Sequence, residues 1–210
     1  FVGPVGLAYA RKLITDGLGW TRPVPAPATE SLDAASAERL APTVERAEIE
    51  GRVLGIPPEE RVALAAGALR GMSLTSGFGR LVLLVGHGST TVNNPHATGL
   101  DCGACGGRTG EANARVAAAI LNDPAVRAGL AEDEGIEVPE DTRFVAALHD
   151  TTTDEVAIFE REALADTHGE DLAALDGWLR EAGRLSRAER APKLQLDPGA
   201  EVDGAVRARS

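Results

Sequence analysis

The stretch LVLLVGHG (residues 81–88) decides the fold of this chain. Its first five residues are a short, continuous apolar run of β-forming side chains, which predicts a strand buried on both faces, as in a parallel sheet. A second apolar run at residues 143–148 predicts another strand. Between them, an Ala-rich stretch (residues 111–121) and a stretch that opens with Asp123-Pro124 and runs to about residue 130 predict two helices. This order of elements indicates an α/β unit with parallel strands and a right-handed crossover.

The segments on either side are expected to be mainly helical. Helices are expected over residues 5–18, over 31–55 with a kink at Pro42, over 57–72, and over an amphipathic stretch whose apolar face includes Leu172, Trp178 and Leu185. A Pro-rich connector occupies residues 23–27, and residues 196–210 are expected to form a loop.

These patterns divide the chain into three parts. Residues 1–77 hold helical segments and the Pro-rich connector, residues 78–156 hold the α/β core with the candidate site, and residues 157–210 hold a helix and a C-terminal loop. We expect all three to belong to one incomplete domain.

The composition argues against several classes of protein. The 210 residues are 43% apolar and 25% charged, a balance typical of a soluble globular protein. Lys and Arg number 21 against 32 Asp and Glu, and the resulting net charge of −11 argues against nucleic-acid binding. Aromatic residues make up only 3%, which argues against base-stacking surfaces and aromatic sugar-binding clefts. No apolar run approaches the roughly 20 residues of a membrane-spanning helix.

The two cysteines, Cys102 and Cys105, lie close together in the sequence. A secreted scaffold held by disulfides would use more cysteines and spread them along the chain. A reducing compartment is therefore expected, with the thiols used for chemistry or for metal binding. The chain opens with Phe1-Val2-Gly3-Pro4, without an initiating Met or a signal-peptide pattern, and we interpret it as an internal piece of a longer protein.

Two histidines follow the predicted strands directly. His87 follows the first strand and His149 follows the second. Ligands of open α/β sheets collect at the carboxyl ends of the strands, so both imidazoles are candidates for a site. Gly86 and Gly88 flank His87, and their lack of side chains favours close approach of a ligand to its imidazole.

Imidazole and thiolate are the ligands that zinc prefers, usually four of them in a tetrahedron. His87 and Cys102 are the first choice for metal ligands in this sequence. Asp101, Cys105 and His96 are weaker candidates, either as further ligands or as groups that support the ligands, and His149 is a candidate for a supporting role. A catalytic zinc leaves one position for water, whose pKa falls to about 7.

The residue types leave other interpretations open. His87 could be a hydrogen-bonding residue at a strand end, and Cys102 and Cys105 could be buried thiols or a redox pair. The glycines at positions 103–110 favour a turn before the next helix, although backbone N–H groups at a helix N-terminus also attract anions. His168 is expected to be solvated.

Six short strings together resemble the DabA family, the large β-carbonic-anhydrase-like subunits of bacterial energy-coupled inorganic carbon pumps. They are GHGS (86–89), NNPH (93–96), DCGACGG (101–107), NAR (113–115), LNDP (121–124) and HDTTTD (149–154). The resemblance is strongest over residues 78–156. It implies a β-carbonic-anhydrase-like fold, which is a mostly parallel sheet flanked by helices, here as a partial domain.

The resemblance also implies a zinc site made of two Cys, one Asp and one His. His87 matches the family's histidine ligand and Cys102 matches its second cysteine ligand. The other two ligands belong to a Cys-x-Asp-x-Arg segment upstream in the family, and this chain has no third cysteine. The sequence therefore holds half of a zinc site, and little activity is expected from it alone.

The function implied by the resemblance is inorganic carbon uptake. A zinc hydroxide would hydrate CO₂ to bicarbonate, driven through DabB, a proton-conducting membrane subunit, with this subunit bound peripherally at the cytoplasmic side of the cell membrane. Two other functions stay open. One is a scaffold module in which Cys102 and Cys105 help to form a structural zinc knuckle, and the other is a thiol-redox protein that uses the same two cysteines.

Overall fold

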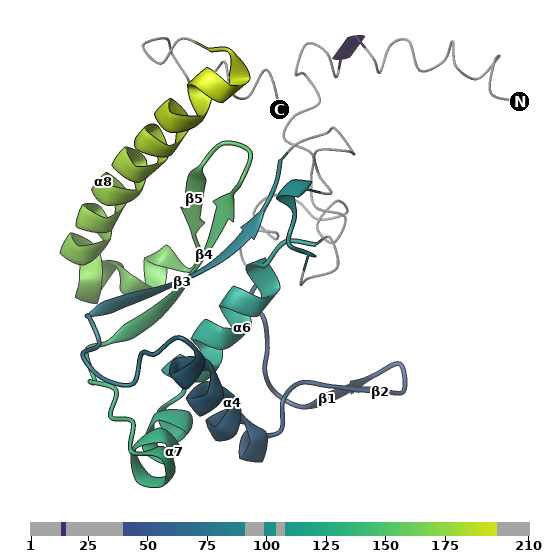
Figure 1. Ribbon diagram of the computed structural model, residues 1–210. Helices are drawn as coiled ribbons and strands as arrows, with labels where there is room; N and C mark the ends of the chain where they lie inside the picture. The colour runs from purple at the N-terminus through teal and green to yellow at the C-terminus, as the bar shows by residue number, and fades with distance from the viewer. Residues whose placement is uncertain (1–13, 16–39, 91–98, 104–107, 197–210) are drawn as a thin grey trace, which may run out of the picture.

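The computed structural model describes residues 14–15, 40–90, 99–103 and 108–196 (Figure 1). Of the helix expected over residues 5–18, only residues 14–15 are described, and both are helical. The Pro-rich connector and nearly all of the C-terminal loop expected at 196–210 lie outside the described residues.

A three-stranded sheet forms the centre of the molecule, in the order β3-β4-β5. β3 (Leu81–Gly88) and β4 (Arg143–Asp150) are parallel over their whole length, as the sequence predicts. β5 (Glu155–Ile158) pairs antiparallel with the end of β4 and was not predicted. The expectation of a strand buried on both faces is wrong for β3, where Val85 is 50% exposed. Among the described residues β3 has a neighbouring strand on one side only.

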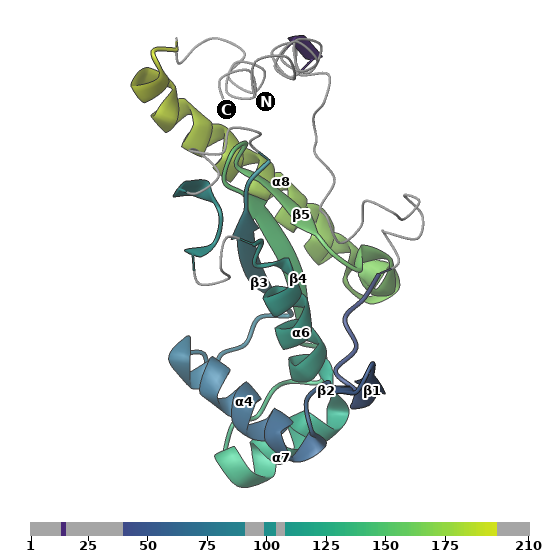
Figure 2. The ribbon, with the colours of Figure 1, turned by 90° about the vertical axis from the view of Figure 1, so that its right-hand side faces the viewer.

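Two helices connect the parallel strands. α6 (Glu111–Asn122) agrees closely with the first predicted helix. α7 (Pro124–Glu134) begins where the second was predicted to begin and continues about one turn beyond its predicted end near residue 130. The Asp123 side chain accepts a hydrogen bond from the N–H of Ala125 (2.9 Å), and Pro124 takes the first helical position, so the predicted N-cap is confirmed. α6 lies on one side of the sheet and α8 (Ala165–Arg190) lies on the other (Figure 1 and Figure 2).

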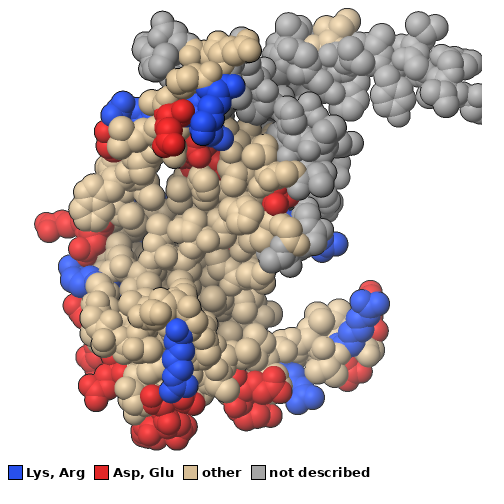
Figure 3. Space-filling model, in the orientation of Figure 1, with Lys and Arg blue, Asp and Glu red and all other residues tan. Residues whose placement is uncertain are grey.

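The apolar core is shared between elements that are far apart in the sequence. α4 (Pro58–Gly71) buries Ala65, Ala66 and Leu69 in the same cluster as Leu130 of α7 and residues of α6 and β4. α4, from the first of the three parts, thus shares one apolar cluster with the α/β part. Acidic side chains gather at the end of the molecule that α4 and α7 form (Figure 3).

Part of the helix expected over residues 31–55 is instead a β-hairpin. β1 (Ala47–Ile49) and β2 (Arg52–Leu54) pair antiparallel around a two-residue turn. Glu50 and Gly51 both have positive φ, 51° and 74°, which is the geometry of a type I′ turn. Residues 31–39 lie outside the described part.

The long C-terminal helix differs from its prediction in the face that it buries. α8 follows a 3₁₀ turn, η3 (Arg161–Leu164), and leads into another, η4 (Ala191–Leu194). Trp178 is 70% exposed and Leu185 is 54% exposed, whereas Leu172 is buried as predicted. None of the described helices is both long enough and apolar enough to cross a membrane.

His168 is not solvated, contrary to the sequence-based expectation. It is 3% exposed and lies at a kink near the start of α8. Its Nε2 is 2.8 Å from the carbonyl oxygen of Asp141, and its Nδ1 is 2.7 Å from the hydroxyl of Thr167. His168 therefore fastens α8 to the loop that precedes β4.

Candidate functional site

The two histidines predicted at strand ends are neighbours in the sheet. His87 and His149 are partners in the parallel register of β3 and β4, so both strands end at the same edge, as expected. Their surroundings differ. His87 Nδ1 is buried and has no hydrogen-bond partner among the described residues, whereas His149 Nε2 lies 3.2 Å from Asp154 Oδ1.

The glycines around His87 allow backbone to pack on backbone. A Cβ on Gly86 would lie 2.5 Å from the carbonyl carbon and oxygen of Gly110, and a Cβ on Gly88 would lie 2.6 Å from the Thr109 side chain. The N–H of Gly110 donates to the carbonyl oxygen of His87 (2.8 Å). The space that these glycines leave is therefore filled by residues 109–110 of the same chain, not left open for a ligand.

Cys102 lies on a segment that is fastened to the end of β3. It is 9% exposed and pairs with Arg108 in an isolated antiparallel bridge. Next to it, Asp101 Oδ1 accepts hydrogen bonds from the N–H of Ser89 (3.0 Å) and from its hydroxyl (2.8 Å). One carboxylate oxygen of Asp101, a weaker ligand candidate, is thus already occupied. His96 and Cys105 lie outside the described residues.

Sequence reasoning missed a carboxylate at the end of β4. Asp150 Oδ2 accepts from the hydroxyls of Thr90 (2.7 Å) and Thr153 (3.0 Å), and Oδ1 accepts from the N–H of Thr152 (2.9 Å). Burial raises the pKa of Asp150, but these hydrogen bonds together lower it by more than burial raises it. The pKa of Asp150 is therefore below its ordinary value. The sequence signal was the run of three threonines directly after a strand.

His149 belongs to a network on the α8 side of the sheet. Its partner Asp154 also forms an ion pair with Arg190 of α8. Arg190 Nη1 donates to the carbonyl oxygen of Thr151 (3.1 Å), and Arg187 Nη1 donates to that of Thr153 (2.8 Å). The end of α8 thereby fixes the turn between β4 and β5.

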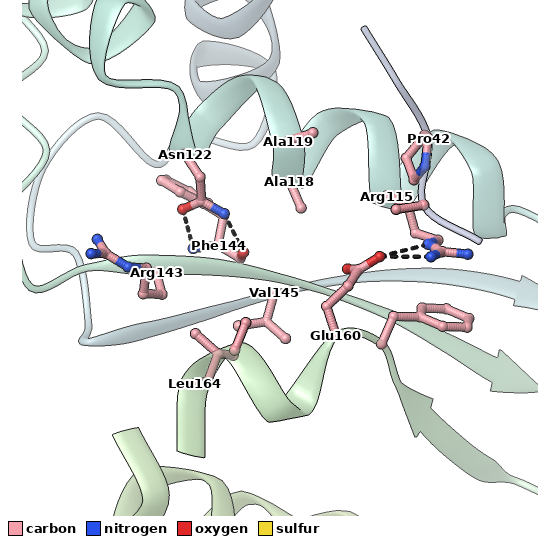
Figure 4. A pocket seen from close by; sticks show the side chains of 13 residues that line it. Pro42, Arg115, Ala118, Ala119, Asn122, Arg143, Phe144, Val145, Glu160 and Leu164 are labelled. Atoms are coloured by element: carbon pink, nitrogen blue, oxygen red, sulfur yellow. Dashed lines mark hydrogen bonds and ion pairs between the residues drawn. The ribbon is translucent and has the colours of Figure 1, made fainter. Parts of the chain in front are cut away.

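A separate hollow of about 310 Å³ lies between α6, β4 and residues 159–164 (Figure 4). Arg115 and Glu160 form an ion pair at one end of it (2.7 Å). At the other end Asn122 bonds both backbone groups of Phe144. Its lining includes none of the residues that the sequence nominates for a site.

A family model described as "Probable inorganic carbon transporter subunit DabA" matches residues 1–210. The chain belongs to the DabA family. Relatives of that name are 64% identical over all 210 residues in Roseiflexus castenholzii and 53% identical over 197 residues in Acidithiobacillus ferrooxidans. A relative named subunit DabA 1 in Bradyrhizobium sp. is 55% identical over the whole chain. The chain spans about a quarter of the length of these curated relatives. No solved structure matches it.

Two described residues, His87 and Cys102, have the donor chemistry that zinc sites use. The buried, unpartnered Nδ1 of His87 is a nitrogen whose burial a metal ion would compensate, and Cys102 supplies a thiol of the kind that zinc prefers. Within the described ranges, no group of three or more His, Cys, Asp or Glu side chains is placed to hold a metal. The described residues therefore include candidate donors for zinc but no group of three or more.

Proposed function

We propose that this chain is part of the zinc-binding subunit of an energy-coupled inorganic carbon pump, with CO₂ and bicarbonate as its substrates. The observation that carries the proposal is the unpartnered His87 Nδ1 at the end of a parallel strand, beside a segment that holds Cys102. The name of the relatives, inorganic carbon transporter subunit, supports the biological role. We also propose a β-carbonic-anhydrase-like fold, supported by the parallel pair β3–β4 with helices on both sides.

In this proposal His87 and Cys102 hold Zn²⁺, and Asp101 and His149 support them. When bound, zinc supplies a hydroxide at neutral pH that can add to CO₂. Ser89 orients Asp101, and Asp154 orients His149. Residues 109–110 pack on Gly86 and Gly88, the two neighbours of His87, and so fix the backbone at the end of β3.

The remaining two ligands would come from the rest of the full-length protein. β3 has a neighbouring strand on one side only among the described residues, and ligands at the carboxyl ends of adjacent parallel strands lie close together. A further strand on the open side of β3 that ends in Cys-x-Asp-x-Arg would place a thiolate and a carboxylate beside His87. For the whole assembly we propose a DabB-type proton-conducting partner and a peripheral position on the cytoplasmic side of the cell membrane.

The test uses the full-length protein in cells that depend on carbon uptake. His87→Ala and Cys102→Ala are each expected to lower bound zinc and to abolish uptake, because each removes a metal ligand. Cys105→Ser is the matched control and is expected to have a milder effect. Normal zinc content and uptake in the His87 and Cys102 variants would contradict the proposal.

The variants of the two cysteines also test the two alternative functions, a structural zinc knuckle and a thiol-redox protein. Equal loss of folding in Cys105→Ser and Cys102→Ser would favour a structural zinc knuckle. A reversible disulfide between Cys102 and Cys105 would favour a thiol-redox protein.

A further inference from the structure

Thr151, the residue directly after β4, contacts both of the segments that carry His87 and Cys102. The N–H of Thr151 donates to the carbonyl oxygen of Gly88 (2.8 Å). Its hydroxyl lies 2.8 Å from the carbonyl oxygens of Gly88 and of Leu100. We propose that Thr151 is a positioning residue that fixes Cys102 relative to His87. The inference rests on the zinc site proposed above.

The donors of Thr151 can be assigned to their acceptors. A hydroxyl has one proton to donate, so the two carbonyl oxygens compete for it. The carbonyl of Gly88 already accepts the N–H of Thr151, and the hydroxyl can then serve Leu100. Thr151 thus holds the end of β3 through its backbone and the segment of Cys102 through its side chain.

The hydrogen bonds of Thr151 lie close in sequence to both candidate ligands. Gly88 is the residue after His87, and Leu100 is two residues before Cys102. Consecutive Cα atoms are about 3.8 Å apart, so the hydrogen bond to Leu100 acts within about 8 Å of the Cys102 Cα. Metal–ligand distances in protein sites hold to about 0.2 Å, so a small displacement of this segment is enough to weaken binding.

Thr151 links the two segments to β4, which the Ser89–Asp101 hydrogen bonds do not do. Ser89 and Asp101 join the same two segments to each other. Thr151 joins both of them to β4, and the carbonyl of Thr151 is itself held by Arg190 of α8. Thr151 therefore holds the Cys102 segment in place relative to the sheet, whereas the Ser89–Asp101 bonds hold it only relative to the loop after β3.

The experiment compares three variants of the full-length protein. Thr151→Val removes the hydroxyl but keeps the side-chain shape and the backbone N–H, and Thr151→Ser keeps the hydroxyl. Thr142→Val is the matched control, because Thr142 is buried at the opposite end of β4 and its hydroxyl donates to the carbonyl of Gly79 (3.1 Å).

Zinc affinity, measured by competition with a chelator, is the first readout. Thr151→Val is expected to weaken zinc binding about 10- to 100-fold, the usual effect of losing a group that orients a ligand. The thiolate-to-metal absorption band of the Co²⁺-substituted protein should change as well. Thr151→Ser and Thr142→Val should stay close to wild type, since both leave the bond to Leu100 in place.

The rate at which iodoacetamide alkylates Cys102 in metal-free protein is the second readout, followed by peptide mass spectrometry. Thr151→Val should raise this rate several-fold over wild type and over both other variants. Absence of zinc from the wild-type protein would sink the proposed function, whereas the alkylation rates would still decide the role of Thr151. An unchanged rate in Thr151→Val would overturn the positioning role.

Discussion

At the scale of single residues, Gly86 is a position where one added methyl group would collide with backbone. A Cβ there would meet the backbone of Gly110 at 2.5 Å, and backbone cannot rotate away as a side chain can. Gly86→Ala is expected to lower the free energy of unfolding by about 1–3 kcal/mol, the usual range for overpacking. Urea denaturation of the 210-residue chain measures this change.

Gly67→Ala is the control for Gly86→Ala. Gly67 lies in the interior of α4, and a Cβ there would meet nothing within 4 Å. Because alanine has the higher helix propensity, this variant should gain about 0.5–1 kcal/mol. Equal losses in the two variants would show that contact between Gly86 and Gly110 is unimportant.

Asp150 makes the stability of the strand ends depend on pH. The pKa of Asp150 is lower in the folded protein than in the unfolded chain. The ionised carboxylate therefore stabilises the fold fully above the unfolded-state pKa of about 3.9, and this stabilisation is lost as the pH falls through the folded-state pKa. Asp150→Asn should cost about 1.5–3 kcal/mol at pH 7, the usual value of hydrogen bonds to a charged group, and should flatten the stability profile between pH 5 and 2.

Thr90→Val tests the cause of that pH dependence. Removing the hydroxyl that donates to Asp150 Oδ2 should raise the pKa of Asp150, and carboxyl carbon NMR can follow the shift. An unshifted Asp150 titration in Thr90→Val would rule out the hydrogen bond as a cause.

At this scale the sequence predicts where the candidate site lies better than it predicts which hydrogen bonds fix the site's residues. A histidine at the end of an apolar strand is readable as a site residue, and His87 and His149 lie at the expected edge. Asp150 and Thr151 were missed because their role depends on acceptors and donors from segments about 50 to 60 residues away, such as Leu100 and Thr90. Partners on distant segments leave no pattern in the local sequence, whereas the threonine run after β4, which supplies the other two donors to Asp150, does.

At the scale of elements, the N-terminus of α7 shows a cap that sequence reasoning identified correctly. Asp123→Ala should lower the free energy of unfolding by about 1 kcal/mol, since it removes the acceptor for the N–H of Ala125. Asp123→Ser keeps a capping oxygen and should cost less. The exposed Asp133 near the other end of α7 provides a further control, and Asp133→Ala should change stability by less than about 0.5 kcal/mol. Equal effects at both ends would exclude the cap.

Elements with strong local signals were predicted, and those that depend on a partner were not. α6, α7, β3 and β4 have regular apolar patterns and clear ends. β5 has four residues and owes its existence to pairing with β4. The β1–β2 hairpin was misread as helix because its signal is one glycine in a two-residue turn.

The buried face of α8 has a similar explanation. Arg187 and Arg190 turn inward because the carbonyls of the β4–β5 turn accept their hydrogen bonds, and Gly183 packs against the backbone of Asp154. With this face turned to the sheet, Trp178 points to solvent. Apolar periodicity alone assigns arginine to the outside and cannot predict such an orientation.

At the scale of the whole molecule, the shared core predicts one cooperative unit. Leu69 of α4 is fully buried in the cluster that also holds Leu130 of α7 and Phe144 of β4. Leu69→Ala should cost about 2–5 kcal/mol, the usual range for a core leucine. The exposed Leu64 of the same helix is the control, and Leu64→Ala should cost much less.

Hydrogen exchange in Leu69→Ala then decides whether residues 1–77 are separate from the rest. If α4 and the α/β core unfold together, amides of β3, β4 and α7 should lose protection by the same free energy as amides of α4. Wild-type protection in β3 and β4 with loss confined to α4 would instead make the boundary after residue 77 a true domain boundary. Cooperative loss is the expected result, because the side chains that α4 buries pack in the same cluster as those of α6, α7 and β4.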